Sequence, residues 1–515
     1  MTGLAIDGLV DRYLAHHARF HPVDATFIGL PDGHDRLPPA GADTPAEERA
    51  SLRTLRRDLD ALAPGATVAD RLDARMLRAA LVHAEAALDH RPRWHQPSWY
   101  SGEIAFALIS LLLPTAPAGA GEALAARLDA IPGFLAAGRL ALAGRPTPSD
   151  WCRRAQRECD ALLRLLTQGL PLHMLWRATL TPRIERAKAA LAEFSGGLAT
   201  LPDADPACGR DYLALLMREV HGLPWTPEEA CALAEEAFVR LGAALRAHPG
   251  NHAPEPRAVD PGDLPTAYAR WHTRALDAGA GLVTPAQDYG LDFLPQPDWA
   301  RCCAGDLYFL SYRSPPAIAP GRGSVYWTAV AAQGPTAIKQ THAVHHGSIG
   351  HHTQNARART AASRLARIAG TDAASGIALL AAGTMVEGWA CYATEAMAEI
   401  DGFYTPREEM ALIAGDRRNA ASVLADIRLH TGEWSLSRMR SFYRDEAGFP
   451  EPRIWGETTR NSILPATRLM YFLGTEQIKA LRRRSALGTR DFHDRLIGFG
   501  HVPIAWAAAE MDAAA

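Results

Sequence analysis

The amino-acid sequence predicts a mainly α protein, with two helical lobes around a deep central cleft and a small β element near residues 306–330. Apolar residues recur with the 3.6-residue period of amphipathic helices along most of the chain. A length of 515 residues exceeds the usual size of one compact core. We therefore expect an N-terminal lobe at 1–248 and a second lobe at 263–515, joined in one integrated domain.

Helical periodicity accounts for the first lobe. A hydroxyl residue before a first-turn proline marks three of its helix starts, at Thr44-Pro45, Thr181-Pro182 and Thr226-Pro227. Residues 249–262 are rich in proline, glycine, histidine and aspartate, which predicts a linker or long loop. The expected helices cover residues 4–20, 45–63, 67–90, 120–143, 150–169, 181–196, 209–218 and 226–247.

The second lobe combines a short strand region with further helices. Residues 306–312 and 324–330 are rich in aromatic and β-branched residues, and proline-containing turns separate them, which predicts a hairpin or strand pair. Two short helices are expected in the tail from 489 to 514. Between these regions, helices are expected at 337–347, 352–369, 374–401, 406–430, 434–447 and 462–485.

Composition excludes several classes of protein. The net charge is −3 and no long single-sign block occurs, so neither nucleic acid nor an anionic membrane is an expected partner. Asp7 and Asp11 stand where a signal peptide needs basic residues, and no uncharged apolar window of membrane-spanning length occurs. Seven cysteines without a Cys-x-x-Cys spacing favour reduced thiols. We expect a soluble, cytoplasmic protein that acts on a small molecule or peptide, and the sequence leaves its oligomeric state open.

A dense group of histidines is the strongest sign of chemistry. It consists of His342, His345, His346, His351 and His352, which lie within eleven residues. Imidazole is the commonest protein ligand for zinc, and two histidines plus a carboxylate from another helix leave one position open for water. On an ideal α-helix His352 shares the face of His345, whereas His351 lies roughly 120° away.

Glu387 is the matching carboxylate. It lies within the apolar helix expected at 374–401, next to Met385, Val386 and Trp389. Burying a lone glutamate there is costly unless a cation or a hydrogen-bond donor accompanies it. Periodicity alone thus predicts His345, His352 and Glu387 as a possible set of ligands.

Several separated motifs resemble those of the bacterial proteins with domain of unknown function 885, relatives of the zinc metallopeptidases that carry a His-Glu motif. The resemblance extends over nearly the whole chain, and the motifs follow in the same order. They are Pro22–Gly29, His34–Pro38, Tyr326–Pro335, Ala343–His352, Glu387–Trp389, Arg460–Gly474, Asp491–Asp494 and Gly500–Pro503.

The resemblance implies a zinc site formed by His345, His351 and Glu387, with iron or another divalent transition metal as the alternative. Members of the family typically read His-Glu-x-x-Pro-Gly-His-His, with the first and the penultimate histidine on zinc. A glycine break can distort the helix before His351, and Gly350 retains that glycine, so we predict His351 rather than His352 as the ligand.

The family's catalytic glutamate is replaced by His346 in this chain. In a zinc peptidase that carboxylate takes the proton from water and later passes it to the leaving amine. His346 could instead act as the base, become a fourth ligand, or leave the site inactive. The family's Pro-Gly-Gln is likewise changed, to Pro465-Ala466-Thr467, and Arg468 replaces a small residue.

Three further residues are candidates by analogy. Tyr471 and His430 would steady developing negative charge, and Arg460 would pair with a substrate carboxylate. For each of them, ordinary packing or a surface ion pair is the competing interpretation.

The sequence therefore predicts a metal-dependent hydrolase for an amide bond of a peptide or small amino-acid conjugate. One alternative is a repurposed metalloenzyme that catalyses an elimination, cyclisation or oxidation in a biosynthetic pathway. A third is an inactive metal-binding protein.

Overall fold

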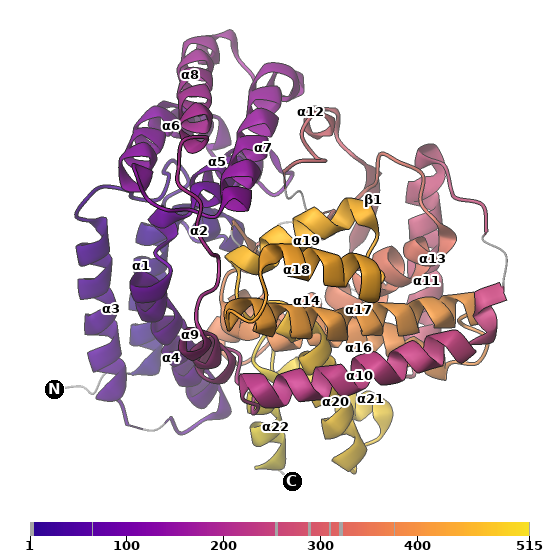
Figure 1. The fold of residues 1–515 in the computed structure, drawn as a ribbon. Helices are drawn as coiled ribbons and strands as arrows, with labels where there is room; N and C mark the ends of the chain where they lie inside the picture. Colours follow the sequence, from indigo (N-terminus) through magenta and orange to yellow (C-terminus); the bar gives the residue numbers. More distant parts are fainter. Residues whose placement is uncertain are drawn as a thin grey trace. The chain divides into compact units, whose positions relative to one another are not determined.

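The computed structural model describes residues 5–63, 65–252, 256–286, 290–307, 311–318, 323–374 and 376–513. Helices dominate and the strands are few and short, which confirms the prediction of a mainly α protein. The chain divides into two compact units, each made of discontinuous segments (Figure 1). Unit 1 comprises Met1–Pro206, Gln296–Arg322 and Thr371–Ala378, and unit 2 comprises Ala207–Pro295, Gly323–Gly370 and Leu379–Ala515.

The predicted boundaries at 248 and 263 do not coincide with this division. Helix α10 (Pro227–Ala247) packs along α17 (Pro406–His430), and the two run side by side in Figure 1. Because this contact joins distant parts of the chain, α10 belongs to unit 2 although the sequence places it before the expected linker. Part of that linker, residues 253–255, lies outside the described residues.

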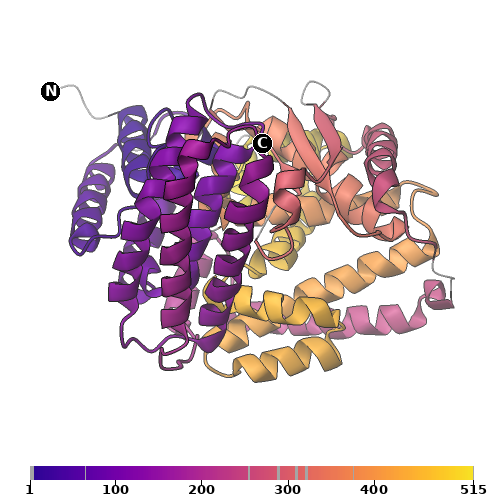
Figure 2. The ribbon, with the colours of Figure 1, turned by 90° about the horizontal axis from the view of Figure 1, so that it is seen from above.

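Unit 1 is a helical array, whose purple helices stand side by side in Figure 2. Helices α5, α6, α7 and α8 pack on one another, and α1 packs on α2, α3 and α4. Its small strands are β2 (Tyr312–Arg313), β4 (Asp372–Ala373) and β5 (Gly376–Ile377). Its helices are α1 (Ile6–Phe20), α2 (Pro22–Ile28), α3 (Thr44–Asp60), α4 (Val68–His90), α5 (Pro97–Leu112), α6 (Ala120–Leu142), α7 (Ser149–Arg164), the π-turn η2 (Leu165–Gly169), α8 (Thr181–Leu198) and α12 (Asp298–Arg301).

Helix α5 was missed by the sequence analysis. Nearly all of its residues are buried, so it has no polar face and no amphipathic period. Its apolar residues from Ile104 to Leu112 are part of the core of unit 1.

Unit 2 contains the histidine segment and the C-terminal helices. Its two strands, β1 (Leu291–Pro295) and β3 (Ser324–Thr328), pair in parallel, with Phe293 opposite Tyr326. Its remaining elements are α9 (Arg210–Leu215), the π-turn η5 (Leu216–Val220), α11 (Leu264–Gly279), α13 (Pro335–Ala337), η8 (Ile338–His345), η9 (Ser348–His352), α14 (Thr353–Ala358), α15 (Arg364–Ile368), α16 (Gly383–Ala396), α18 (Leu436–Ser441), the π-turn η12 (Phe442–Glu446), α19 (Glu451–Ile463), α20 (Leu469–Arg484), α21 (Thr489–Gly498) and α22 (Ile504–Asp512).

The strand region agrees only partly with its prediction. The expected strand at 324–330 is present as β3, whereas the strand expected at 306–312 is reduced to β2, and residues 308–310 lie outside the described ones. Strand β1 was not predicted, because it is five residues long and ends at Pro295. The helix expected at 374–401 begins only at Gly383, after the β4–β5 turn.

All seven cysteines are free thiols. Among the described residues, the helices are too short or too polar to span a bilayer.

Candidate metal centre

The histidine segment of unit 2 is not a regular α-helix. Residues Ile338–His345 and Ser348–His352 form π-helical turns, separated by a break around Gly347. Gly350 has φ −78° and ψ −129°, which is not helical. A Cβ atom at Gly350 would lie 2.0 Å from the carbonyl oxygen of His345, so this close approach of two backbone segments requires glycine.

This backbone brings three imidazoles together. One ring nitrogen from each of His345, His346 and His351 lies within 4.8 Å of the others. The ring centroids of His345 and His351 are 4.9 Å apart, and their planes are nearly perpendicular. His352 is buried and packs edge-on against His272, with ring centroids 5.5 Å apart. The ideal-helix argument for His352 fails because the segment is π-helical and broken.

Glu387 reaches the same point from α16. Its Oε2 lies 4.0 Å from Nε2 of His345 and 3.6 Å from Nε2 of His351. Its Oε1 accepts a 2.9 Å hydrogen bond from the Tyr471 hydroxyl on α20. The structure thus brings the three predicted ligands together, with Tyr471 beside them, and their role as ligands stays a prediction.

Two glycines explain how Tyr471 reaches Glu387. Helices α16 and α20 pack against each other, and a Cβ atom at Gly388 would lie 2.7 Å from Cα of Gly474. Trp389, on the next position of α16, donates a 3.0 Å hydrogen bond from Nε1 to the carbonyl oxygen of Ile349. The Glu387-Gly388-Trp389 motif therefore supplies a carboxylate, a close helix crossing and a tether to the histidine turn.

Burial sets the protonation states of the cluster. It lowers the pKa of His345 to about 3, with a further lowering from His351, and it lowers the pKa of His346 well below its usual value. Burial alone would raise the pKa of Glu387, but its hydrogen bond with His351 and nearby positive charges, including that of Arg460, lower it to about 2. Neutral imidazoles beside an ionised carboxylate are the states that a divalent cation requires.

Hydrogen bonds on the outer side orient the rings. Nδ1 of His351 lies 3.4 Å from Oε1 of Gln354, whose Nε2 donates to the carbonyl oxygen of Met385 at 2.7 Å. Nδ1 of His346 lies 3.0 Å from the hydroxyl of Tyr326. Such contacts fix the ring orientation and tautomer of metal-binding histidines. Gln354 was not among the predicted site residues, and the signal for it in the sequence is its place three residues after His351.

The donor set fits the zinc that the resemblance implies. Two Nε2 atoms and one carboxylate converge, which is a three-ligand set with a position left open. His346 adds a third imidazole, with a ring nitrogen within 4.8 Å of ring nitrogens of His345 and His351. Among the described residues, the group of three or more candidate ligands within 4.8 Å of one another is His345, His346 and His351, and Glu387 is not part of it.

Arg460 and His430 lie in different surroundings. Arg460 is half-buried on α19, and its charge contributes to the low pKa of Glu387. His430 is fully buried at the end of α17, where Nε2 lies 2.9 Å from the carbonyl oxygen of Asn461 and 3.5 Å from Oδ1 of Asp426. These contacts favour a packing role for His430.

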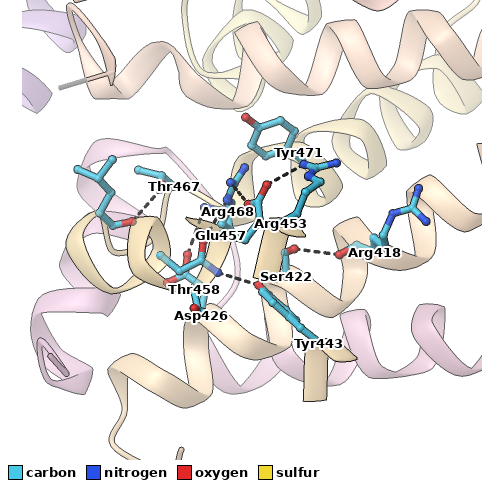
Figure 3. Close-up of polar contacts among 12 residues, drawn as sticks. Arg418, Ser422, Asp426, Tyr443, Arg453, Glu457, Thr458, Thr467, Arg468 and Tyr471 are labelled. Carbon is cyan, nitrogen blue, oxygen red and sulfur yellow. Dashed lines mark hydrogen bonds and ion pairs between the residues drawn. The ribbon is translucent and has the colours of Figure 1, made fainter. Parts of the chain in front are cut away.

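A network of charged groups lies to one side of Tyr471 (Figure 3). Arg468 donates to Oδ1 of Asn461 at 3.0 Å, forms an ion pair with Glu457, and lies 5.4 Å from the ring centroid of Tyr471. Its backbone N–H, like that of Ala466, is bound by the Asp426 carboxylate. Arg468 therefore joins the turn after Pro465 to the ring of Tyr471.

Comparisons with known proteins agree with this architecture. Residues 22–274 and 304–511 match the profile of a family described as "Bacterial protein of unknown function (DUF885)". No curated protein matches the chain. The match covers far more than half of the residues.

Two solved structures have the same fold. One is described as "a putative lipoprotein of unknown function from Shewanella oneidensis", with a TM-score of 0.74 and 15% identity, covering 99% of this chain and 100% of that one. The other is "the putative lipoprotein from Colwellia psychrerythraea", with a TM-score of 0.76, 15% identity and 98% coverage of both chains. At this identity the likeness shows the fold alone. These neighbours do not support the predicted cytoplasmic location, which stays a prediction.

Proposed function

Since the chain belongs to the bacterial DUF885 family, whose description names no function, we propose one from the site: a metal-dependent hydrolase that cleaves an amide bond of a peptide or small amino-acid conjugate. The observation that carries the proposal is the convergence of three imidazole nitrogens within 4.8 Å, with the Glu387 carboxylate 3.6–4.0 Å from two of them.

Each residue of the site has a role in this proposal. His345, His351 and Glu387 would hold zinc, which when bound polarises a carbonyl group and acidifies water. His346 would accept the proton of the attacking water through its remaining ring nitrogen. Its low pKa keeps it unprotonated at neutral pH, but also makes it a weaker base than a group with a pKa near 7.

Tyr471 and Arg460 would contact the substrate. The Tyr471 hydroxyl donates to Glu387 and could turn its proton toward an oxygen that gains negative charge. Arg460 carries a positive charge close enough to affect Glu387, which suits a substrate with a carboxylate. His430 is left out of the proposed chemistry, because its ring is enclosed by Asn461 and Asp426.

A second candidate follows from the position of His346. As a third imidazole beside His345 and His351, it could bind the ion as well and favour iron or copper over zinc. The reaction would then be a non-hydrolytic elimination, cyclisation or oxidation.

The test combines metal analysis with product analysis. Purified protein is assayed for bound metal and incubated with dipeptides and N-acyl amino acids in water enriched in ¹⁸O, and the products are measured by mass spectrometry. We expect one equivalent of zinc and one ¹⁸O atom in the carboxylate product. His346→Ala should retain zinc and lose at least ~100-fold in turnover, whereas His352→Gln, outside the cluster, should retain both.

Other results would decide against hydrolysis. Iron or copper with a product that lacks ¹⁸O supports the second candidate. Tight binding of a substrate without any turnover supports an inactive binding protein.

We also propose a reducing compartment for the chain, because all seven cysteines are free thiols. Cell fractionation of the native host tests this proposal. The protein is expected in the cytoplasmic fraction, and recovery of a lipid-modified form from membranes would contradict it.

A further inference from the structure

The hydroxyl of Tyr326 lies between two histidines. It is 2.5 Å from Nδ1 of His342 and 3.0 Å from Nδ1 of His346. Tyr326 is 1% exposed and its backbone is fixed in β3, where it pairs with Phe293 of β1. The phenol therefore has two imidazole neighbours and little freedom to leave them.

Proton counting limits this arrangement to two forms. A phenol has one proton, so it can donate to one imidazole nitrogen and must accept from the other. If Tyr326 donates to His342, then His346 carries its proton on Nδ1 and has a free lone pair on Nε2. If Tyr326 donates to His346, the proton of His346 lies on Nε2, which can then neither bind a cation nor accept a proton.

The two distances select the first form. Bonds donated by a hydroxyl are usually shorter than bonds donated by an N–H group, for which 2.9–3.0 Å is typical. The 2.5 Å contact with His342 fits donation by the phenol, and the 3.0 Å contact with His346 fits donation by the imidazole.

Packing holds His342 in its accepting position. Its ring stacks on Tyr268 with the centroids 4.7 Å apart and an angle of 12° between the planes. Tyr268 also packs edge-on against Tyr326, at 5.5 Å. The three rings therefore hold the Tyr326 hydroxyl and Nδ1 of His342 in place beside each other.

We propose that Tyr326 and His342 are positioning residues that hold His346 in its Nδ1–H tautomer, so that Nε2 is free for the site. This inference rests on the proposed function for its purpose, because a free Nε2 matters only if His346 acts as a base or a ligand. The tautomer itself is independent of any metal or substrate.

The experiment is nuclear magnetic resonance on metal-free protein labelled with [¹⁵N]histidine, with the signals of His346 assigned by their loss in His346→Gln. We expect His346 in wild type to carry its proton on Nδ1. His342→Phe retains the stacked ring but removes the acceptor, so it should move the proton of His346 to Nε2. Tyr326→Phe should remove the preference for a single tautomer.

Tyr268→Phe is the matched control, because it retains the stacking ring and removes a hydroxyl that neither histidine contacts in the described hydrogen bonds. It should leave the tautomer unchanged. A wild-type His346 with its proton on Nε2, or a His342→Phe protein with an unchanged tautomer, would overturn the inference.

Activity assays separate this inference from the proposed function. If hydrolysis is present, His342→Phe should lower kcat 10- to 100-fold with little change in KM, the range seen for residues that support a metal site. Absence of zinc and of hydrolysis would defeat the proposed function and leave the tautomer result standing. The reverse tautomer in an active zinc enzyme would defeat the inference alone.

Discussion

Two groups of histidines lie in this molecule, and they differ in geometry rather than in burial. In unit 1, His16 and His17 lie near the end of the regular helix α1 and His21 is its C-cap. In unit 2, His345 and His351 lie in π-helical turns and His346 is the C-cap of the first turn. Burial lowers the histidine pKa values in both groups.

The three histidines at the end of α1 contact three different side chains. His16 contacts Ser51 at 2.8 Å, His17 lies 3.7 Å from Asp24, and His21 lies 3.9 Å from Glu48. The π-helical turns instead direct three ring nitrogens to one point. A dense group of histidines therefore becomes a candidate site only where the backbone makes the donors converge.

The largest expected effect concerns metal affinity. His345→Ala, His351→Ala and Glu387→Ala should each weaken zinc binding more than about 100-fold, because even residues that only support ligands contribute 10- to 100-fold. His16→Ala should leave the affinity unchanged. Competition with a zinc chelator measures both. Equal weakening by His16→Ala would remove the distinction between the two groups.

The next effect concerns the buried ion pair of Lys339 with Glu408, which anchors the histidine segment to α17. Lys339 in η8 is buried, forms a 2.8 Å ion pair with Glu408, and lies 4.4 Å from the ring centroid of Trp271. Lys339→Met leaves the Glu408 carboxylate without its cation, which should cost about 3–5 kcal/mol in urea unfolding. The more exposed pair of Lys188 with Glu185 is the control, and Lys188→Met should cost less than about 1 kcal/mol. A similar small loss for both would show that the anchor is unimportant.

The pH dependence of stability tests the other group. Burial lowers the pKa of His17 to about 3, below the 6.5 of the unfolded chain, so the unfolded state binds the extra proton. Its contribution to stability is fully present above pH 6.5 and is lost as the pH falls toward 3. His17→Phe should reduce the slope of unfolding free energy against pH by up to about 1.4 kcal/mol per unit in this window.

Two buried carboxyl groups of unit 1 change the stability with pH in the opposite direction to His17. Burial raises the pKa of Asp24 to about 6 and that of Glu103 to about 8, so both stabilise the folded state at low pH and lose this effect as the pH rises. The comparison of His17→Phe with wild type, by urea titrations at several pH values, leaves the contribution of Glu103 in place, and Asp24→Asn measured in parallel accounts for the carboxyl group 3.7 Å from His17. An unchanged slope would show that His17 is protonated in the folded protein.

The smallest effect is expected near another buried histidine, His430, which contacts Asp426. Ala466 has a positive φ of 65°, a conformation that favours glycine, and its N–H is bound by Asp426. Ala466→Gly should relieve this strain and stabilise the protein by up to about 1 kcal/mol, measured as a higher Tm. A lower Tm would mean that the buried methyl group contributes more than the strain costs.

Local signals predicted the fold well where helices are amphipathic and capped. The helix expected at 406–430 is observed as Pro406–His430, because Thr405 and Glu408 form a capping box before a first-turn proline. The same features mark α10, expected at 226–247 and observed as Pro227–Ala247. Helix α5 has no polar face, so periodicity could not reveal it.

The sequence predicted the candidate metal ligands, but not the residues that hold those ligands in place. His345, His351 and Glu387 follow from the resemblance, whereas periodicity alone led to His352, because it assumes an α-helix where the backbone is π-helical. The contact of Tyr326 with His342 joins a strand to a π-turn, and no local pattern encodes such a pairing.

The most direct test is the anomalous scattering of zinc in crystals of the protein grown with one equivalent of the metal. We predict a single strong peak within bonding distance of Nε2 of His345, Nε2 of His351 and the carboxylate of Glu387. A peak bound elsewhere, with these three side chains contacting only one another, would contradict this prediction.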